Sequence, residues 1–471
     1  MVGETALSGK YTAYSEYKDS GISGLGSIPN HWEVMQLKRT VDGCVNGIWG
    51  AEPKKDRNDT IVLRVADFDR PKLSIQENGY TYRKLEDKDK ITRKLKRGDL
   101  LLEKSGGGAK TLVGQVVLFD KDFEAVTSNF VAKMTPNEGF NNRFLNYVFS
   151  RFYSDNINYC SIKQNTGIQN LDSAAYLAEK FGFPLEQEQE KIANFLDHET
   201  AKIDTLIDKQ QQLIKLLKEK RQAVISHAVT KGLNPNASMR DSGVEWLGDV
   251  PEHWFVVPLK RVCEVKDGTH DTPQYVDPSE ESFPLITSKD FEGNDISFAN
   301  SKYISKEDHL EVIKRSNTEV GDVLMSMIGG NIGKALIVKD HADFSIKNVA
   351  LFKTVDSENL AKYILYYLQS GLLDVQISLL GRGGAQGFLS LGDLRNLVFF
   401  KVPEIELEEI VASLDKKIIR FDNLIAKAKS AIGVMQERRT ALISSAVTGK
   451  IDVRYWVDPQ SSNNQHNAVT V

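Results

Sequence analysis

The sequence lacks the features of secreted, membrane-spanning and zinc-binding proteins. Its 471 residues include only three cysteines, Cys44, Cys160 and Cys263, with no Cys-x-x-Cys spacing. Neither a zinc site nor a disulfide framework is therefore expected, and we predict three reduced thiols that are mostly buried. No apolar run approaches the roughly 20 residues that a membrane span needs, and the N-terminus shows no signal-peptide core. We expect a cytoplasmic protein.

Motifs for nucleotide binding and catalysis are also missing. A P-loop would need glycine at positions 104 and 109, where this chain has Lys104 and Ala109. The sequence contains no dinucleotide glycine fingerprint, no Asn-Pro-Pro-aromatic loop and no His-Glu-x-x-His. Its carboxylates suggest no particular acid/base pair, although a scattered nuclease site stays open. We expect no catalytic residue, no metal site and no cofactor in this chain.

The net charge of −4 does not point to nucleic acid, because nucleic-acid-binding domains are usually basic. The charge is uneven, however, since positions 90–97 carry five basic residues and no acid. Four of these are expected to contact phosphates: Arg93, Lys94, Lys96 and Arg97. Acids gather instead near position 186, where they would interact favourably with the dipole of a helix that begins there.

Residues 184–232 have the pattern of one long, charged helix. Apolar residues recur at steps of four and three with some positions skipped, as in the seam of a coiled coil. The predicted seam is Ile192, Leu196, Ile203, Leu206, Leu213, Leu217 and Val224. At about 1.5 Å per residue, some 40 residues would form a rod of about 60 Å, which needs a partner helix.

Residues 403–451 supply that partner by repeating the same seam 218 positions later (410 − 192 = 218). The matching residues are Ile410, Leu414, Phe421, Leu424, Ala431, Met435 and Leu442. The helix ends match as well, since Ala223-Val224-Ile225-Ser226 returns as Ala441-Leu442-Ile443-Ser444. We interpret this as a tandem duplication whose two helices pair with each other.

A second repeat, offset by 222 positions, opens each half of the chain (241 − 19 = 222). Asp19-Ser20-Gly21 and Pro29-Asn30-His31-Trp32 return as Asp241-Ser242-Gly243 and Pro251-Glu252-His253-Trp254. We interpret the His-Trp pairs as packing elements rather than sites. Further on, a Gly-Asp turn, an apolar strand and a glycine loop recur in the same order in both halves.

The predicted fold is α/β, with two mixed α/β domains and two long helices that form an antiparallel coiled coil with pseudo-two-fold symmetry. The expected domains are residues 1–183, the first helix 184–232, a second domain 233–402, the second helix 403–451 and a polar tail 452–471, which we expect to be disordered from about position 458. Duplex DNA shares this symmetry, and a two-fold protein reads half-sites about one helical turn apart or a multiple of it. Because the loops of the two halves differ, the target should be split and asymmetric.

Several phrases of the chain resemble the DNA-specificity subunits of type I restriction-modification systems. They include Tyr17–Gly21, Ile28–Trp32, Glu188–Ile192, Lys218–Ala223 and Ala446–Asp452, and the resemblance covers nearly the whole chain in order. One departure is that the second helix opens at Pro403–Glu409 without a Glu-Gln pair.

The resemblance implies two target-recognition domains joined by two helical regions that pack as an antiparallel coiled coil. It implies binding to double-stranded DNA and assembly with two methyltransferase subunits, which bind S-adenosylmethionine and methylate adenine. Two restriction subunits would add ATP-driven translocation and cleavage. On this interpretation S-adenosylmethionine, ATP and Mg all belong to partner subunits.

Base-reading residues are predicted from side-chain chemistry, with Lys and Arg for guanine and Asn and Gln for adenine. The candidates flank the glycine loops and the closing turns: Lys104, Lys110, Gln169, Asn170, Lys334, Arg382 and Gln386. Two other functions stay open. One is a self-contained nuclease or methyltransferase with divergent motifs, and the other is a coiled-coil scaffold for partner subunits without sequence specificity of its own.

Overall fold

A computed structural model describes residues 11–55, 59–108, 111–165, 167–340, 343–381 and 387–457. The chain divides into two compact units, the first built from two stretches of sequence and the second from one. Unit 1 is Met1–Gln210 with Ser430–Val471, and unit 2 is Gln211–Lys429. The boundaries fall inside two long helices, α4 (Glu186–Lys231) and α9 (Glu404–Val447), so each unit holds one segment of each helix. The predicted polar tail lies outside the described residues from position 458 onward.

Unit 1 is a mixed α/β domain with a four-stranded antiparallel sheet at its centre. That sheet has the order β11-β9-β13-β4 and consists of β4 (Val45–Asn46), β9 (Leu100–Glu103), β11 (Val116–Leu118) and β13 (Val131–Met134). A second sheet, β12-β5-β8, consists of β5 (Asp59–Leu63), β8 (Thr81–Lys84) and β12 (Ala125–Thr127). In this sheet β12 pairs with β5 in parallel.

Smaller pairings and three helices complete unit 1. The pairs are β1 (Tyr17–Asp19) with β2 (Ser27–Pro29), β3 (Glu33–Gln36) with β16 (Lys180–Phe183), and β6 (Phe68–Asp69) with β7 (Ser74–Ile75). A three-stranded sheet joins β10 (Ser105–Gly106), β15 (Ile168–Leu171) and β14 (Ile162–Asn165). The helices are α1 (Asp87–Arg93), α2 (Asn142–Ser154) and α3 (Ser173–Ala178).

Unit 2 repeats most of this plan, with one more strand, β21, in its second sheet. Its central sheet, β20-β29-β26-β27, consists of β20 (Glu264–Asp267), β26 (Val323–Ser326), β27 (Ala335–Ile337) and β29 (Val349–Lys353). Its second sheet, β21-β25-β22-β28, consists of β21 (Tyr275–Val276), β22 (Ser282–Ile286), β25 (Lys302–Ser305) and β28 (Ser345–Ile346). Here β28 pairs with β22 in parallel, as β12 pairs with β5 in unit 1.

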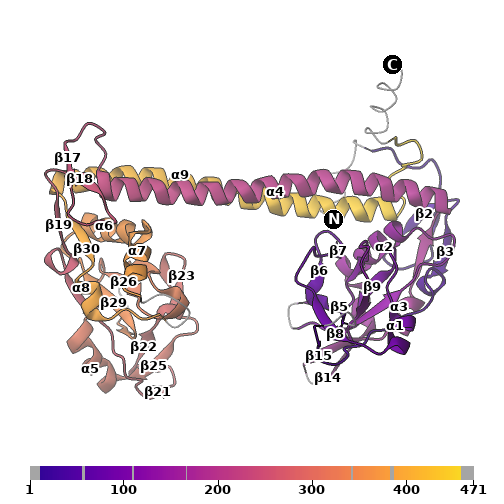
Figure 1. The fold of residues 1–471 in the computed structure, drawn as a ribbon, viewed down its shortest axis with the longest axis horizontal. Helices are drawn as coiled ribbons and strands as arrows, with labels where there is room; N and C mark the ends of the chain where they lie inside the picture. Colours follow the sequence, from indigo (N-terminus) through magenta and orange to yellow (C-terminus); the bar gives the residue numbers. More distant parts are fainter. Residues whose placement is uncertain are drawn as a thin grey trace. The chain divides into compact units, whose positions relative to one another are not determined.

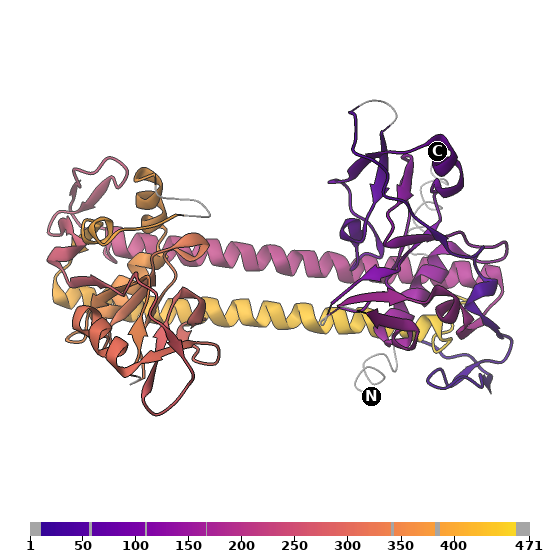
Figure 2. The same cartoon turned by 90° about the horizontal axis from the view of Figure 1, so that it is seen from below.

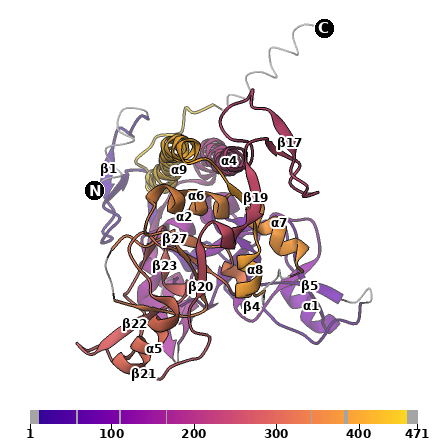
Figure 3. The same cartoon turned by 90° about the vertical axis from the view of Figure 1, so that its left-hand side faces the viewer.

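The remaining elements of unit 2 also have counterparts in unit 1. The pairs are β17 (Met239–Asp241) with β18 (Asp249–Pro251), β19 (Phe255–Pro258) with β30 (Val398–Lys401), and β23 (Phe291–Glu292) with β24 (Asp295–Ile296). The helices are α5 (Lys306–Ser316), α6 (Glu358–Gln369), α7 (Leu372–Leu379) and α8 (Leu391–Arg395). Figure 3 shows α6 directly beneath the long helices, where Tyr363 donates to the carbonyl of Val229 at 3.1 Å.

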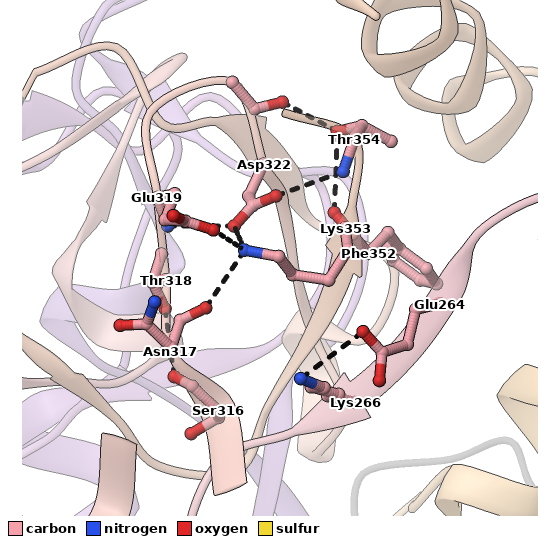
Figure 4. Close-up of polar contacts among 11 residues, drawn as sticks. Glu264, Lys266, Ser316, Asn317, Thr318, Glu319, Asp322, Phe352, Lys353 and Thr354 are labelled. Atoms are coloured by element: carbon pink, nitrogen blue, oxygen red, sulfur yellow. Dashed lines mark hydrogen bonds and ion pairs between the residues drawn. The ribbon is translucent and has the colours of Figure 1, made fainter. Parts of the chain in front are cut away.

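The Gly-Asp turn of each half starts the central strand, as the sequence predicts. In unit 2 the Asp322 carboxylate accepts hydrogen bonds from the backbone N–H of Glu319 at 2.8 Å and of Thr354 at 3.1 Å (Figure 4). The ammonium of Lys353 lies 2.6 Å from the same carboxylate. In unit 1, Asp99 accepts from the backbone of Lys96 and from the Thr135 hydroxyl, each at 2.7 Å. This buried aspartate is therefore a structural residue in both units.

The two long helices pair antiparallel within each unit (Figure 2). An equivalent ion pair joins them in both units. In unit 1, Arg439 lies 3.0 Å from Asp204. In unit 2, Arg221 lies 3.2 Å from Asp422. These residues match by the 218-residue offset of the helices (422 − 204 = 218; 439 − 221 = 218). The predicted α/β fold, duplication and antiparallel helix pairing are confirmed.

The predicted seam needs a correction in the middle of the helices. Leu206, Leu213 and Leu424 are 50%, 43% and 42% exposed. The next residue along faces the pairing instead: Ile425 is only 8% exposed, and Ile207 packs against the core of unit 1. Adjacent apolar residues made the step ambiguous, and the helix advances by four residues from Ile203 rather than by three. Five predicted seam residues nearer the helix ends, Ile192, Leu196, Ile410, Leu414 and Leu442, are all 1% exposed or less. At the predicted Val224 the buried residue is instead the next one, Ile225, which is 0% exposed.

One glutamate attaches each domain to the first turn of a long helix. The Glu188 carboxylate accepts hydrogen bonds from the Trp32 indole at 2.9 Å and the Tyr14 hydroxyl at 2.7 Å, and His31 Nε2 lies 2.8 Å away. Glu406 takes the same place in unit 2, 2.9 Å from the Trp254 indole nitrogen.

These contacts refine three sequence interpretations. The His-Trp pairs are packing elements, as predicted. Glu188 does more than favour the helix dipole, because it binds three side chains. The second helix keeps the glutamate, since Glu406 is 218 positions after Glu188 (406 − 188 = 218), and only the glutamine is replaced, by Leu407. The thiols need one correction, because Cys160 is exposed while Cys263 is buried.

Replacing Glu188 with alanine should destabilise the chain by roughly 2–4 kcal/mol, because each buried donor left without an acceptor costs about 1–3 kcal/mol. Urea denaturation of the purified variant measures this loss. Glu406→Ala should cost less, since Glu406 pairs with two side chains rather than three and is itself more exposed than Glu188. Glu190→Ala, an exposed acid on the same turn, is the control. Equal stability of the Glu188 and Glu190 variants would contradict the attachment described here.

Candidate nucleic-acid interface

In each unit, the glycine that follows the edge strand of the central sheet lies where two backbone segments come too close for any side chain. A Cβ on Gly47 would lie 2.1 Å from the carbonyl oxygen of Thr127, and a Cβ on Gly268 would lie 2.2 Å from that of Ile346. Both glycines follow the edge strand of the central sheet, β4 or β20. The two units therefore have the same backbone framework at this point.

In unit 1 this framework supports a polar and aromatic surface, which we call face 1. Its residues come from five separate stretches of sequence: Asn46, Trp49, Lys104, Ser105, Asn129, Phe130 and Asn170. They surround two adjoining pockets of about 430 and 440 Å³, which share Ser105 and Asn129. Figure 1 shows β14 and β15 of this region at the end of unit 1 farthest from the long helices.

The equivalent surface of unit 2, face 2, consists of His270, Thr272, Lys347, Asn348 and Phe388. His270 Nδ1 lies 2.9 Å from the Asn348 amide oxygen, and its ring centre lies 6.2 Å from that of Phe388. The Lys347 ammonium donates a hydrogen bond to the Thr272 hydroxyl. Amides, lysines and exposed aromatic rings are the groups that contact bases and phosphates in protein–DNA interfaces.

Two of the predicted base-reading residues lie on face 1. The Lys104 ammonium donates to the Asn46 amide oxygen at 2.8 Å, and the Ser105 hydroxyl donates to the Asn170 amide oxygen at 2.6 Å. Both side chains line the same pocket. Their predicted contacts with bases stay a prediction, now supported by this shared position.

The other predicted base-reading residues lie elsewhere or outside the described residues. Gln169 is 4% exposed, and its amide accepts from the Val113 N–H and donates to the Gly108 carbonyl, so it holds the glycine loop. The Lys334 ammonium donates to the Phe291 carbonyl. Lys110, Arg382 and Gln386 lie outside the described residues.

A buried ion pair lies under face 1. Glu103 is 1% exposed and lies 2.7 Å from Arg70. Burial raises the pKa of the Glu103 carboxyl, although Arg70 acts in the opposite direction. Trp49 lies 4.4 Å from the Arg83 guanidinium, in a cation–π contact. The two residues that these pairs hold in place, Glu103 and Trp49, line the same pocket of face 1.

Three of the four residues of the predicted phosphate-binding cluster form ion pairs with acidic side chains. Arg97 lies 2.8 Å from Asp122, and Lys94 lies 3.2 Å from Glu124. Arg93 pairs with Asp89 on the same turn of α1 at 2.9 Å. Exposed pairs of this kind contribute about 0–1 kcal/mol, so a phosphate can replace the acid at little cost.

The structure shows no sign of a metal centre or a membrane span in the parts of the chain it describes. Within those ranges no group of three His, Cys, Asp or Glu side chains is placed to hold a metal ion. No helix there is long and apolar enough to cross a bilayer.

Comparisons with known proteins agree with this architecture. The family model described as type I restriction modification DNA specificity domain matches residues 31–216. A putative type I restriction enzyme MjaX specificity subunit of Methanocaldococcus jannaschii is 23% identical over 440 residues, which are 91% of this chain and 96% of that protein. The MjaVIII specificity subunit of the same organism is 26% identical over 377 residues, which are 78% of this chain and 82% of that protein.

Residues 31–216 of this chain belong to the type I restriction-modification DNA specificity domain family. A solved structure described as the structural basis of complex assembly and conformational transition of the type I R-M system has the same fold. Its TM-score is 0.64 at 16% sequence identity, with 89% of this chain and 98% of that chain covered. The resemblance seen in the sequence is confirmed.

Sequence reasoning missed most of the two faces in this specificity-family chain. Trp49, Asn129, Phe130, His270, Lys347 and Asn348 were not among its candidates. The available signal was the 218-residue offset, which aligns Phe130 with Asn348 (348 − 130 = 218) on strands with the same pairing. At this offset the two halves carry different side chains at equivalent positions, and that difference would have identified these positions as candidates.

Replacing Arg93, Lys94, Lys96 and Arg97 together with alanine should weaken binding to all DNA sequences alike. Each lost phosphate contact should reduce the slope of log affinity against log salt by about 0.9. Fluorescence anisotropy at several salt concentrations measures both effects. A matched variant that replaces Lys416, Lys417, Lys427 and Lys429 of α9 with alanine removes the same charge elsewhere. Equal slopes for the two variants would exclude contact between the cluster and phosphates.

Proposed function

We propose that this chain is the DNA-recognition subunit of a type I restriction-modification complex and reads a split, asymmetric sequence. The chain itself carries out no catalysis. Each of its two domains reads one half-site, and partner subunits modify or cut the DNA. The proposal agrees with the names of its relatives in Methanocaldococcus jannaschii.

One observation carries this proposal: two domains share one framework but present different side chains on equivalent faces. Gly47 and Gly268 hold the framework, whereas Phe130 is replaced by Asn348. Proteins read bases through side chains held in a fixed register on the duplex. Equal frameworks with unequal side chains are therefore suited to two unequal half-sites.

The partners that we propose are two methyltransferase subunits and two restriction subunits, in the cytoplasm. S-adenosylmethionine would bind to the methyltransferase subunits, and ATP and Mg would bind to the partners rather than to this chain. The long helices offer apolar contact sites, since Leu206 and Leu216 are 50% and 61% exposed in unit 1 and unit 2 respectively. Exposed leucines on otherwise charged helices are typical of surfaces that partners cover.

A genome-wide map of methylated adenines tests the proposed function. Cells should express the cognate methyltransferase subunit with and without this chain. We expect a split, asymmetric motif that appears only when the chain is present, because specificity is delegated to it. A stable complex that produces no new motif would contradict the proposal and favour a scaffold. Methylation or cleavage of DNA by the purified chain alone would favour a self-contained enzyme.

A further inference from the structure

Asn348 of face 2 is held in an uncommon backbone conformation at the start of a central strand. It lies between β28 and β29 with a φ of 54°, in the left-handed region. Asparagine enters this region more readily than most residues. The backbone N–H of Asn348 donates to the Thr269 carbonyl at 3.1 Å. The backbone conformation and this hydrogen bond therefore determine the direction in which the Asn348 side chain leaves the main chain.

A chain of polar contacts then orients the Asn348 amide. Asp267 is 2% exposed and is held by Arg315 at 2.5 Å. Its other carboxylate oxygen lies 2.9 Å from His270 Nε2. His270 Nδ1 lies 2.9 Å from the Asn348 amide oxygen. A buried ion pair thus supports an imidazole, and the imidazole supports an exposed amide.

The orientation of this amide leaves hydrogen-bonding groups unused. A carboxylate and an amide oxygen both only accept, so both ring nitrogens of His270 donate in this arrangement, Nε2 to Asp267 and Nδ1 to the Asn348 amide oxygen. An asparagine amide has two N–H donors and two acceptor lone pairs, and the contact with His270 uses one of these four. An asparagine that offers one donor and one acceptor side by side matches the N7 and N6 edge of adenine in the major groove.

The equivalent position of the other domain has a different chemistry. Phe130 occupies it, 51% exposed beside Asn129, and Trp49 occupies the place of His270 on the strand pair. Neither side chain can offer a donor and an acceptor to a base edge. Face 1 therefore lacks a supported amide at this position, although its backbone framework is the same.

We propose that Asn348 reads the adenine of one A·T pair in the half-site of the second domain, with His270 as its positioning residue. This inference rests on the proposed function and names one of its base contacts. Lys347, the preceding residue, is placed to contact the adjacent phosphate. The support by Asp267 and His270 reduces the side-chain freedom that would otherwise be lost on binding.

The test is the motif methylated by complexes that carry Asn348→Gly. Glycine suits the positive φ, so this change removes the amide without straining the backbone. We expect one base pair of one half-site to become degenerate, with discrimination reduced about 5- to 100-fold, the range expected for one bidentate contact. The other half-site of the motif is read by the same complexes and therefore serves as an internal control. Asn348→Asp should shift the preference at that pair towards cytosine, whose amine a carboxylate accepts.

Two further variants separate readout from folding. His270→Ala should relax the same base pair and no other, a result that general destabilisation does not produce. Asn317→Ala is the matched control. Asn317 follows α5, and its carbonyl accepts from Lys353, which is at the end of β29 opposite to Asn348. This control should leave the whole motif unchanged.

The outcomes distinguish this inference from the proposed function. A split motif that is identical for the wild type and Asn348→Gly would overturn the reading by Asn348 and leave the proposed function intact. A wild-type complex without any split motif would overturn both. Degeneracy at several pairs of both half-sites in Asn348→Gly would also overturn the inference, because it would reveal a general loss of binding.

Discussion

A single carboxylate on the first turn of each long helix determines how a recognition domain is attached. Glu188 binds the indole of Trp32 and the hydroxyl of Tyr14, and Glu406 binds the indole of Trp254. The tryptophans are fully buried, so their N–H groups need this acceptor. The domain therefore cannot rotate on its helix without leaving a buried donor unpaired. In both units this contact therefore fixes the recognition domain on its long helix.

Duplication explains why the two halves share so much structure and so little surface. The cross-helix ion pairs Asp204–Arg439 and Asp422–Arg221 are the same interaction made twice. The framework glycines and the buried aspartates of the Gly-Asp turns are likewise retained, because any side chain or loss of charge there would disrupt the backbone. Positions on the two faces, such as Phe130 and its equivalent Asn348, carry no such packing constraint. They are free to differ, and the difference is what a split target requires.

The fold was accessible from sequence because its signals are periodic and repeated. Helical spacing, the two offsets and the His-Trp phrases each occur twice and support one another. The faces were not accessible, because Asn46, Lys104 and Asn170 meet only when the sheets form. The ion pairs of the basic run were not accessible for a similar reason: Asp122 and Glu124 follow the run in sequence but pair with it in space. The seam was misplaced where adjacent apolar residues offered two choices, as at Leu206 and Ile207 or at Leu424 and Ile425.

The most direct test of the account is to give one molecule two copies of the same face. Residues 233–401 would be replaced by a second copy of residues 11–183, their equivalent in the duplication, and the complex with its methyltransferase subunit would be used to map methylated adenines. If each domain reads its own half-site, the methylated motif should contain the first half-site twice and lose the second entirely. A motif that keeps the original second half-site would show that recognition does not reside in these domains.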